Sequence, residues 1–475
     1  TPALPAVHTR PSGQVVARVF PWNWSQNLLL NGVTTEVWMQ PGVTEANLHE
    51  HIAAFYHKAG PHAGSVALVL GAGNINSIPA LDTLYKLIAD GEVVLLKFNP
   101  VNEYLAPIFE RIFAPFVNAG FLRITAGGAD AGAYLTQHPS IDTIHITGSE
   151  RTHDAIVYGA GDEGAARKSR DQRLISKPIT SELGGVGAVI VVPGPWSDAD
   201  IRYQAEQIVT MKFHNSGCNC VAAQVLVLPQ NWTRSGDLMD AIREVIRSLP
   251  PRMAYYPGAA ERQRALLAAH PEAELFGGGA APRTLVANLD ASNADEYCFR
   301  EEFFGPILAQ TSLPGATPAE YLSNAVRFAN EQLRGTLGAN ILIHPRTERA
   351  LGANFDAAIA ALRFGAIGIN IWSAAAFLAA EAAWGAYPGH SYTDVQSGIG
   401  VVHNTFLLDS TEKNVSRGPF YPFPRGVLHG SFRLLPRPPW LVTNRTARAT
   451  AERITHFTVA PRLRISSMMR NTACT

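Results

Sequence analysis

Two short segments of the chain contain residues that could carry out covalent chemistry on a carbonyl group. Residues 181–185 contain Glu182 followed closely by two glycines, and residues 215–220 end in a Cys-Asn-Cys triplet whose last member is Cys220. A thiolate can attack a carbonyl carbon and hold the product as a thioester, and a carboxylate can then activate the water that releases it. The two segments therefore supply a candidate general base and a candidate nucleophile.

Composition narrows the class of protein that can use such residues. The chain has 475 residues, more than one hydrophobic core usually organises, so we expect two or more domains. Its 39 Lys and Arg balance 39 Asp and Glu, which argues against nucleic acid or an acidic membrane surface as a partner. Four unevenly spaced cysteines predict a reducing, cytoplasmic setting rather than a disulfide framework. The longest apolar stretch, residues 364–384, is interrupted by polar residues and predicts a buried core, not a membrane span.

Strand and helix patterns alternate in the part of the chain that leads up to Glu182. Continuous apolar runs predict strands, and apolar residues at helical spacing predict the helices between them. This alternation is typical of a parallel sheet covered by helices, so we expect a doubly wound, nucleotide-binding architecture. Between residues 159 and 176 the sequence turns polar and charged, which predicts a solvated loop. The expected strands are residues 65–70, 92–96, 121–124 and 143–146, and the expected helices are residues 81–89, 105–118 and 130–137.

A second α/β pattern begins at residue 186 and continues to about residue 404, with expected strands at 186–192, 224–228 and 337–343. The tail from residue 417 is rich in proline and arginine and has weak periodicity. We therefore predict a three-part chain. Residues 1–182 form a nucleotide-binding domain with a shortened N-terminal part, residues 183–404 form a second α/β domain that carries the cysteine, and residues 405–475 form an extension that packs on the first domain or takes part in oligomerisation.

Five motifs, in order along the chain, resemble those of the aldehyde dehydrogenase superfamily. They are Asn74 with Lys97 one helix and one strand later, Ile-Thr-Gly-Ser at 146–149, Glu-Leu-Gly-Gly at 182–185, Gly-Cys-Asn-Cys at 217–220 and Glu-Glu-Phe-Phe-Gly-Pro at 301–306. The similarity covers roughly residues 66–415. It implies an α/β fold in which a Rossmann-type parallel-sheet domain for a nicotinamide dinucleotide is joined to a second α/β catalytic domain.

The resemblance also implies an activity, the NAD(P)-dependent oxidation of an aldehyde to a carboxylate through a cysteine-bound thiohemiacetal and thioester. Cys220 is implied as the nucleophile and Glu182 as the base that activates water. The Asn74 amide and the backbone N–H of Cys220 are implied as the donors that meet the negative charge developing on the carbonyl oxygen.

The remaining motif residues are implied to hold the cofactor. Lys97 would contact the adenosine ribose, Glu302 would bind the nicotinamide ribose and Phe304 would pack beside the nicotinamide ring. Pro100 stands where NAD-preferring relatives have a glutamate, so NAD and NADP both stay open. The residues implied to line the rest of the cofactor site are Gly148, Ser149, Leu183, Gly184 and Gly185.

Departures from the family pattern leave alternatives open. Cys218 replaces a glutamine, and His153 stands where a glycine usually opens the helix beside the pyrophosphate, so a side chain there would crowd the phosphates or add a donor. A CoA-acylating dehydrogenase or acyl reductase, in which the glutamate is commonly dispensable, is one alternative. A catalytically inactive binding protein is the other.

The sequence also indicates which metal, ligand and protein partners to expect. The cysteine pair lies near His214, but no second ligand pair follows at the spacing of a zinc site, so we expect no metal. We expect a small-molecule aldehyde as the partner, and a homo-oligomer stays open. Trp372, Phe377 and Trp384 either line an apolar substrate tunnel or simply fill the core.

Overall fold

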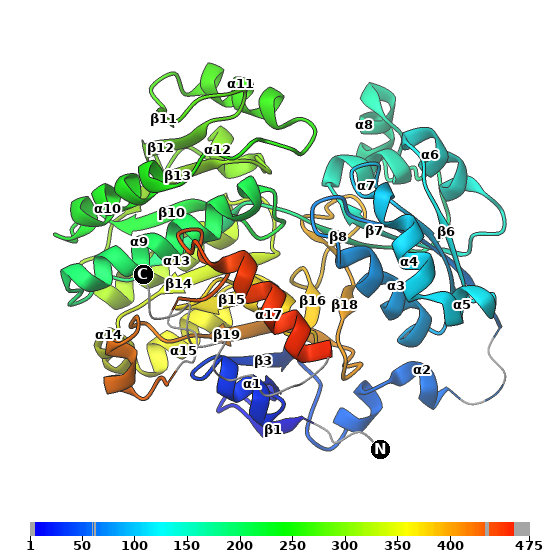
Figure 1. The fold of residues 1–475 in the computed structure, drawn as a ribbon, viewed down its shortest axis with the longest axis horizontal. Coiled ribbons are helices and arrows are strands. Elements are labelled where there is room, and N and C mark those ends of the chain that lie inside the picture. The colour runs from blue at the N-terminus through cyan, green and yellow to red at the C-terminus, as the bar shows by residue number, and fades with distance from the viewer. Residues whose placement is uncertain (1–4, 59, 61–62, 433–436, 460–475) are drawn as a thin grey trace.

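The computed structural model describes residues 5–58, 60, 63–432 and 437–459. The chain forms two α/β units that lie side by side (Figure 1). A six-stranded sheet organises one unit, an eleven-stranded sheet organises the other, and a two-stranded sheet accompanies them. The predicted α/β fold with two parallel-sheet units is confirmed.

The smaller sheet has the strand order β17-β8-β7-β4-β5-β6. Its neighbours pair in parallel except for β17, which runs antiparallel to β8. The apolar strands are covered by helices on both faces, as a parallel sheet requires. The strands are β4 Val66–Leu70, β5 Val93–Lys97, β6 Leu122–Thr125, β7 Thr143–Gly148, β8 Ile179–Leu183 and β17 Gly398–Ile399, and the helices are α3 Ile78–Ile88, α4 Ala106–Ile112, α5 Ala114–Asn118, α6 Ala129–Gln137, α7 Glu150–Val157 and α8 Gly161–Ser169.

Two expectations for this unit were wrong in detail. The helix predicted at residues 105–118 is divided at Phe113 into α4 and α5. The loop predicted at 159–176 contains α8, whose first turn is acidic and whose last turn is basic, the charge order that a helix dipole favours. An ion pair between Arg167 and Glu163, one turn apart, adds to this stabilisation. A polar helix of this kind has no apolar stripe to reveal it in the sequence.

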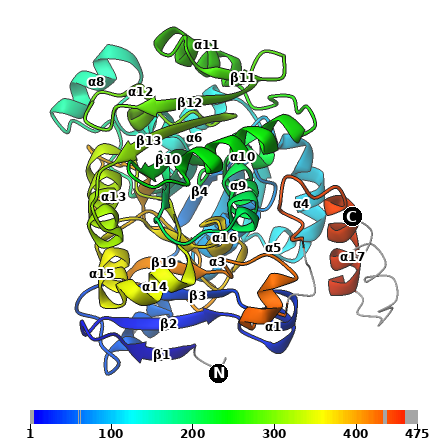
Figure 2. The ribbon, with the colours of Figure 1, turned by 90° about the vertical axis from the view of Figure 1, so that its left-hand side faces the viewer.

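The larger sheet has the strand order β1-β2-β3-β19-β15-β14-β9-β10-β13-β12-β11. Its central strands are parallel, while β1, β2 and β3 at one edge and β11 at the other run antiparallel to their neighbours. Figure 2 shows β1, β2 and β3 continuing the sheet beyond β19. The strands are β1 Ala6–Thr9, β2 Val15–Phe20, β3 Thr34–Met39, β9 Gly187–Val191, β10 Ala223–Pro229, β11 Glu274–Phe276, β12 Arg283–Leu289, β13 Ile307–Leu313, β14 Gly338–Leu342, β15 Ala366–Ile369 and β19 Thr411–Arg417.

The sheets therefore divide the chain differently from the predicted boundaries. Residues 6–39 join the larger sheet and not the one that begins at β4, because β2 and β3 bury apolar residues such as Val15 and Val37 in the large core. The segment after residue 404 also joins this unit through β19. Further along, Arg425 pairs with Asp200 of α9 at 2.5 Å.

Helix α9, Asp198–Phe213, crosses the large unit and is buried along most of its length. It begins with a capping box formed by Ser197 and Asp200 and leads directly into the cysteine loop. The other elements are α1 Trp24–Leu29, α2 Ala54–His57, α10 Ser235–Ser248, α11 Ala259–Ala269, α12 Tyr297–Arg300, α13 Pro318–Gln332, α14 Pro345–Leu351, α15 Ala353–Ala361, α16 Ala374–Leu378, α17 Ala447–Val459, η1 Leu48–His51, η2 Glu103–Leu105, η3 His214–Gly217, η4 Arg425–His429, β16 Ala383–Gly385 and β18 Val401–His403.

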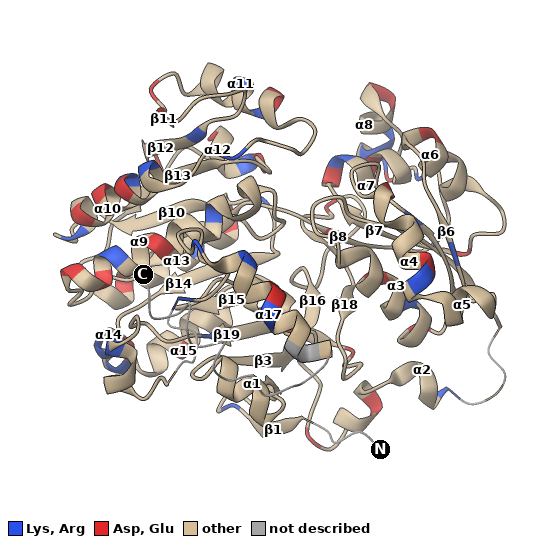
Figure 3. Cartoon of the chain, viewed as in Figure 1, with Lys and Arg blue, Asp and Glu red and all other residues tan. Residues whose placement is uncertain are grey.

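Charged residues of both signs are interspersed on the helices, as on α10 (Figure 3). Among the described residues, no helix is both long enough and apolar enough to cross a membrane.

Candidate active site

Glu182 lies near the carboxyl end of β8, paired in parallel register with Thr147 of β7. The carboxyl ends of parallel strands are where α/β folds bind their ligands. The Glu182 side chain is buried, and its Oε1 has no hydrogen-bond partner among the described residues. Burial raises the pKa of this carboxyl to about 7, and the nearby Asp82 carboxylate raises it further, whereas Cys220 and Trp384 oppose the rise. A carboxyl with such a pKa can act as a base near neutral pH.

The cysteine loop follows α9 and turns through an unusual backbone conformation. Asn215 and Ser216 have positive φ values of 53° and 56°, and Gly217 has a φ of 77°. A Cβ on Gly217 would lie 2.2 Å from the carbonyl oxygen of Gly305, so this position requires glycine. The loop therefore packs closely against residues 301–306, so that two motifs far apart in the sequence are in contact.

Cys218, the departure from the family pattern, stabilises this contact. Its side chain is buried, and Sγ lies 3.6 Å from the Phe304 carbonyl oxygen and 3.8 Å from that of Ser216. Burial raises the pKa of this thiol to about 11. The Cys218 thiol is therefore protonated, and its contacts stabilise the conformation of the loop.

Cys220 faces the cleft, and its neighbours favour the thiol over the thiolate. Burial raises its pKa well above the usual value, and Glu182 and Glu302 raise it further. A thiol with a raised pKa needs a base nearby to form the attacking thiolate. Glu182 lies beside the thiol and can accept its proton.

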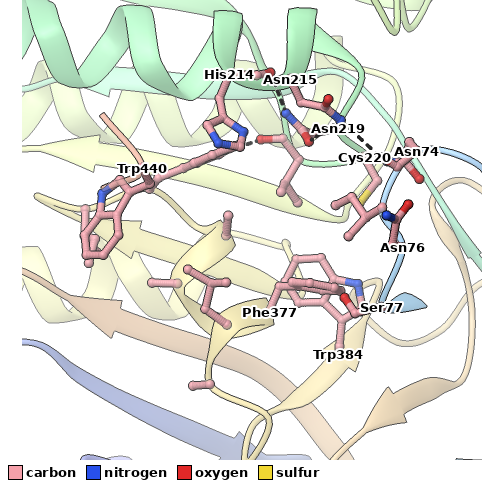
Figure 4. Close-up of a pocket in the computed structure, with 18 of the residues that line it drawn as sticks. Asn74, Asn76, Ser77, His214, Asn215, Asn219, Cys220, Phe377, Trp384 and Trp440 are labelled. Carbon is pink, nitrogen blue, oxygen red and sulfur yellow. Dashed lines mark hydrogen bonds between the residues drawn. The ribbon is translucent and has the colours of Figure 1, made fainter. Parts of the chain in front are cut away.

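Asn74 follows β4 and faces the cysteine loop (Figure 4). Its Nδ2 donates to the Cys218 carbonyl oxygen at 3.1 Å, and Asn215 Nδ2 donates to the Asn74 carbonyl oxygen at 3.2 Å. The Tyr255 hydroxyl donates to the same oxygen at 3.2 Å. Because a side-chain amide has two N–H donors, Asn74 keeps one for a ligand. Asn215 and Tyr255 were not predicted, since Tyr255 lies in a segment without a motif.

A groove of about 820 Å³ crosses the carboxyl ends of the smaller sheet and reaches Cys220. It brings together ten of the residues that the sequence singled out. Leu183 is not among its lining residues, because its side chain is buried. The predicted residues that line the groove are Asn74, Lys97, Gly148, Ser149, Glu182, Gly184, Gly185, Cys220, Glu302 and Phe304.

The donor set of this groove fits a dinucleotide. Ser149 caps the N-terminus of α7, which favours a phosphate, and Lys97 lies further along the groove. Glu302 is half-buried, and its buried Oε1 has no hydrogen-bond partner among the described residues, so it can accept from a sugar hydroxyl. A Cβ on Gly184 would lie 1.9 Å from that oxygen, so glycine is needed for Glu302 to reach the groove. Burial raises the pKa of Glu302 to about 8, opposed by Lys212 and Arg262.

His153 does not take part in this groove. The sequence predicted that its side chain would crowd the phosphates or add a donor, but it is fully buried and its ring lies 6.2 Å from that of Tyr392. The histidine faces the core. Other residues of α7 line the groove.

A second cavity, of about 840 Å³, lies on the other side of the cysteine loop. It shares Asn74 and Cys220 with the groove. Figure 4 shows Phe377, Trp384 and Trp440 among its lining side chains. Trp372 also lines it, so the three aromatic residues singled out in the sequence line a cavity. A ligand in this cavity could therefore bring a carbonyl group to the Cys220 sulfur, and a second ligand in the groove could bring a ring to the same sulfur.

Comparison with known proteins shows which proteins this α/β chain is similar to. Residues 74–252 match the model of the aldehyde dehydrogenase family. An N-succinylglutamate 5-semialdehyde dehydrogenase of Sphingopyxis alaskensis is 31% identical over 203 residues, which are 42% of this chain and 37% of the relative. A probable betaine aldehyde dehydrogenase of Schizosaccharomyces pombe is 25% identical over 319 residues, 62% of this chain and 59% of the relative.

Solved structures agree in fold. A Mycobacterium tuberculosis aldehyde dehydrogenase complexed with NAD⁺ has a TM-score of 0.55 and 20% identity, over 88% of this chain and 73% of that one. The chain spans 37% and 59% of the lengths of the two curated relatives. Together with the motifs, these findings confirm the resemblance to the aldehyde dehydrogenase superfamily.

Proposed function

We propose that this protein oxidises an aldehyde to a carboxylate, with NAD or NADP as the electron acceptor. One observation carries the proposal: the groove and the second cavity meet at Cys220, and Glu182 lies beside its thiol. In this proposal the smaller sheet holds the cofactor, and the larger sheet positions the cysteine. The direct test is a panel of aldehydes with NAD or NADP, followed by the absorbance of the reduced cofactor. A folded protein that reduces neither cofactor with any aldehyde would contradict the proposal.

The residues can divide the reaction between them. Glu182 accepts the Cys220 proton, and the sulfur attacks the carbonyl carbon to give a thiohemiacetal. The free N–H of the Asn74 amide and the backbone N–H of Cys220 donate to the carbonyl oxygen as its charge develops. A nicotinamide bound in the groove would supply the hydride acceptor. Glu182 releases the first proton to solvent and then takes a second one from the water that attacks the thioester, with the Cys220 thiolate as the leaving group.

Lys97 and Pro100 bear on the choice of cofactor. Lys97 lines the groove and can pair with a ribose hydroxyl or a 2′-phosphate, while Pro100 places no carboxylate there to repel a phosphate. The NAD⁺ complex of the Mycobacterium tuberculosis protein supports NAD. The buried Glu182 beside the thiol favours water over coenzyme A as the acceptor of the acyl group, and the presence of Asn74, Glu182 and Cys220 argues against an inactive binding protein.

Replacing Gly184 by alanine should weaken dinucleotide binding by an order of magnitude or more, since the added methyl displaces the Glu302 carboxyl. Fluorescence titration with NADH measures this directly, without turnover. Gly236→Ala is the matched control, because that position is in α10 and a Cβ there meets no atom within 4 Å. Equal affinities for the two variants would contradict the role given to Glu302.

Replacing Asp82 by asparagine should move the pH dependence of hydrolysis. Asp82 is buried behind Glu182, where its Oδ2 accepts from Thr147 Oγ1 at 2.8 Å and lies 3.6 Å from His145 Nε2. Its charge raises the pKa of Glu182, which is about 7. Removing the charge should shift the acid limb of the kcat profile to lower pH, so that the variant keeps more of its activity below pH 7.

The exposed Asp162→Asn change on α8 is the control for this variant, and it should leave the limb in place. A limb that stays at the wild-type pH in Asp82→Asn would show that Asp82 does not act on the base.

A further inference from the structure

The cavity that meets Cys220 selects its substrate by charge. We propose that the substrate is a large, uncharged and mostly apolar aldehyde, and that aldehydes with a fixed charge away from the carbonyl group are rejected. This inference rests on the proposed function, because it concerns the cavity from which a carbonyl would reach Cys220.

The lining of the cavity contains no Asp, Glu, Lys or Arg among the described residues. Its one histidine, His214, has a pKa lowered by burial and by the nearby Arg252, so it is neutral at pH 7. The His214 ring lies edge-on to that of Trp372 at 5.6 Å. A charged group bound in this cavity would therefore lose its water and find no counter-charge, which is costly.

Several polar residues of the lining are already engaged in hydrogen bonds within the protein. Asn219 Nδ2 donates to the His214 carbonyl oxygen at 2.8 Å, and Asn102 Nδ2 donates to the Ala72 carbonyl oxygen at 3.0 Å. The Asn215 amide bridges the Cys218 carbonyl oxygen and the Tyr255 hydroxyl. These groups can orient an aldehyde carbonyl, but none of them carries a charge that could pair with a charged tail.

Aromatic side chains, among them Phe377, Trp384 and Trp440, form part of the cavity wall (Figure 4). Trp372 is fixed by a hydrogen bond of 2.8 Å from its Nε1 to the Val221 carbonyl oxygen. Phe377 packs edge-on against Trp384 with 5.3 Å between ring centroids. Because these rings are held by the protein, the apolar surface is formed before a ligand arrives, which lowers the cost of binding.

The outer part of the cavity is built by segments outside the residues that match the family model. Phe20, Leu30 and Val33 come from the N-terminal part of the chain, and Trp440 comes from the C-terminal part. All four are apolar or aromatic, so the cavity keeps its character along its length. A volume of about 840 Å³ is at the upper end of ordinary ligand pockets and suits a long or multi-ring aldehyde.

The test compares a neutral aldehyde with a negatively charged one of the same chain length and with a smaller, positively charged one. Decanal should have a kcat/KM on the order of 100-fold or more above that of 10-oxodecanoate, which differs by a terminal carboxylate, and above that of betaine aldehyde, which carries a quaternary ammonium. Equal values, or a preference for either charged aldehyde, would overturn the inference while leaving aldehyde oxidation intact.

A binding measurement keeps the test independent of turnover. In the Cys220→Ala variant, 1-decanol should quench tryptophan fluorescence at concentrations at least tenfold below those needed for 10-hydroxydecanoate, because Trp372, Trp384 and Trp440 line the cavity. If no aldehyde is oxidised but this difference is present, the proposed function fails and the apolar cavity stands. Equal quenching by the two compounds contradicts the inference.

A positive charge placed in the cavity should weaken the preference for the neutral aldehyde. Leu378 lines the cavity at the end of α16 and is well exposed, so lysine can be accommodated there. Leu378→Lys should lower the decanal to 10-oxodecanoate ratio at least tenfold. Leu428→Lys, at an exposed leucine outside the cavity lining, should leave the ratio unchanged. An unchanged ratio in Leu378→Lys would contradict selection by charge in this cavity.

Discussion

Cys220→Ala should abolish aldehyde oxidation, with a fall in kcat on the order of 10⁴-fold or more, as expected when the attacking atom of a covalent mechanism is removed. Neither of the other two thiols in the described part of the chain can replace it. Cys218 points its sulfur at the Phe304 carbonyl oxygen, and Cys298 is a buried residue of α12 that lies outside both cavity linings. Dinucleotide binding should survive, because Cys220 is only one of many residues lining the groove. Steady-state kinetics and an NADH titration measure the two effects separately.

Cys218→Ala is the matched control for this variant. It removes an adjacent sulfur that stabilises the loop but does not line either cavity, so much of the activity should be retained. Cys298→Ala, at a second buried cysteine, should behave in the same way. The reverse pattern, with Cys218→Ala inactive and Cys220→Ala active, would move the nucleophile and break the motif alignment.

The parts of this molecule that could be predicted from sequence are those whose signal is local. The apolar run at 65–70 and its successors predicted β4, β5, β6 and β7 within a few residues, since buried parallel strands are continuously apolar. The glycines at 184 and 217 marked places of close approach, and in both cases a Cβ would meet the partner motif. Motif residues from both units consequently line one groove.

What could not be predicted depends on contacts between distant segments. Strands β2 and β3 read as ordinary apolar segments, and only tertiary pairing with β19 places them in the large sheet. The apolar cavity was likewise ambiguous, because aromatic residues at 372–384 are equally typical of a core. Its outer wall needs Phe20 and Trp440, which are 420 positions apart in the sequence and share no motif.

Glu182→Gln should separate the two halves of the reaction. The variant should give a burst of reduced cofactor of about one equivalent per site, followed by turnover slowed on the order of 10²-fold or more, the scale of general-base assistance. The first half is slowed because Glu182 no longer takes the Cys220 proton, but it still outpaces hydrolysis, since loss of the Glu182 charge lowers the pKa of the thiol and water can then accept its proton. Water is a poor nucleophile toward a thioester, so hydrolysis still requires a base and is slow in the variant. Stopped-flow absorbance on mixing with excess aldehyde resolves the two phases.

The pH profile identifies the group responsible for the slow phase. Below about pH 7 the wild-type carboxyl is protonated and cannot accept a proton, so kcat should rise as the pH passes through 7. The rise should be absent from Glu182→Gln. Coenzyme A should not restore its turnover if water is the natural acceptor. A wild-type protein that is silent until coenzyme A is added, or a variant with normal turnover, would instead favour the acylating alternative.

Stability provides the check that the loss comes from chemistry and not from unfolding. The pKa of Glu182 is raised by burial from 4.5 to about 7, so its contribution to stability is fully present below pH 4.5 and is lost as the pH rises through 7. The loss amounts to about 3 kcal/mol, since one pKa unit corresponds to about 1.4 kcal/mol. Glutamine does not ionise, so the Glu182→Gln variant does not lose this stability as the pH rises. Glu182→Gln should therefore unfold at a higher temperature than the wild type at pH 8 and at a similar temperature at pH 4.5, and a lower Tm at pH 8 would show that the carboxylate is stabilised by contacts other than those described here.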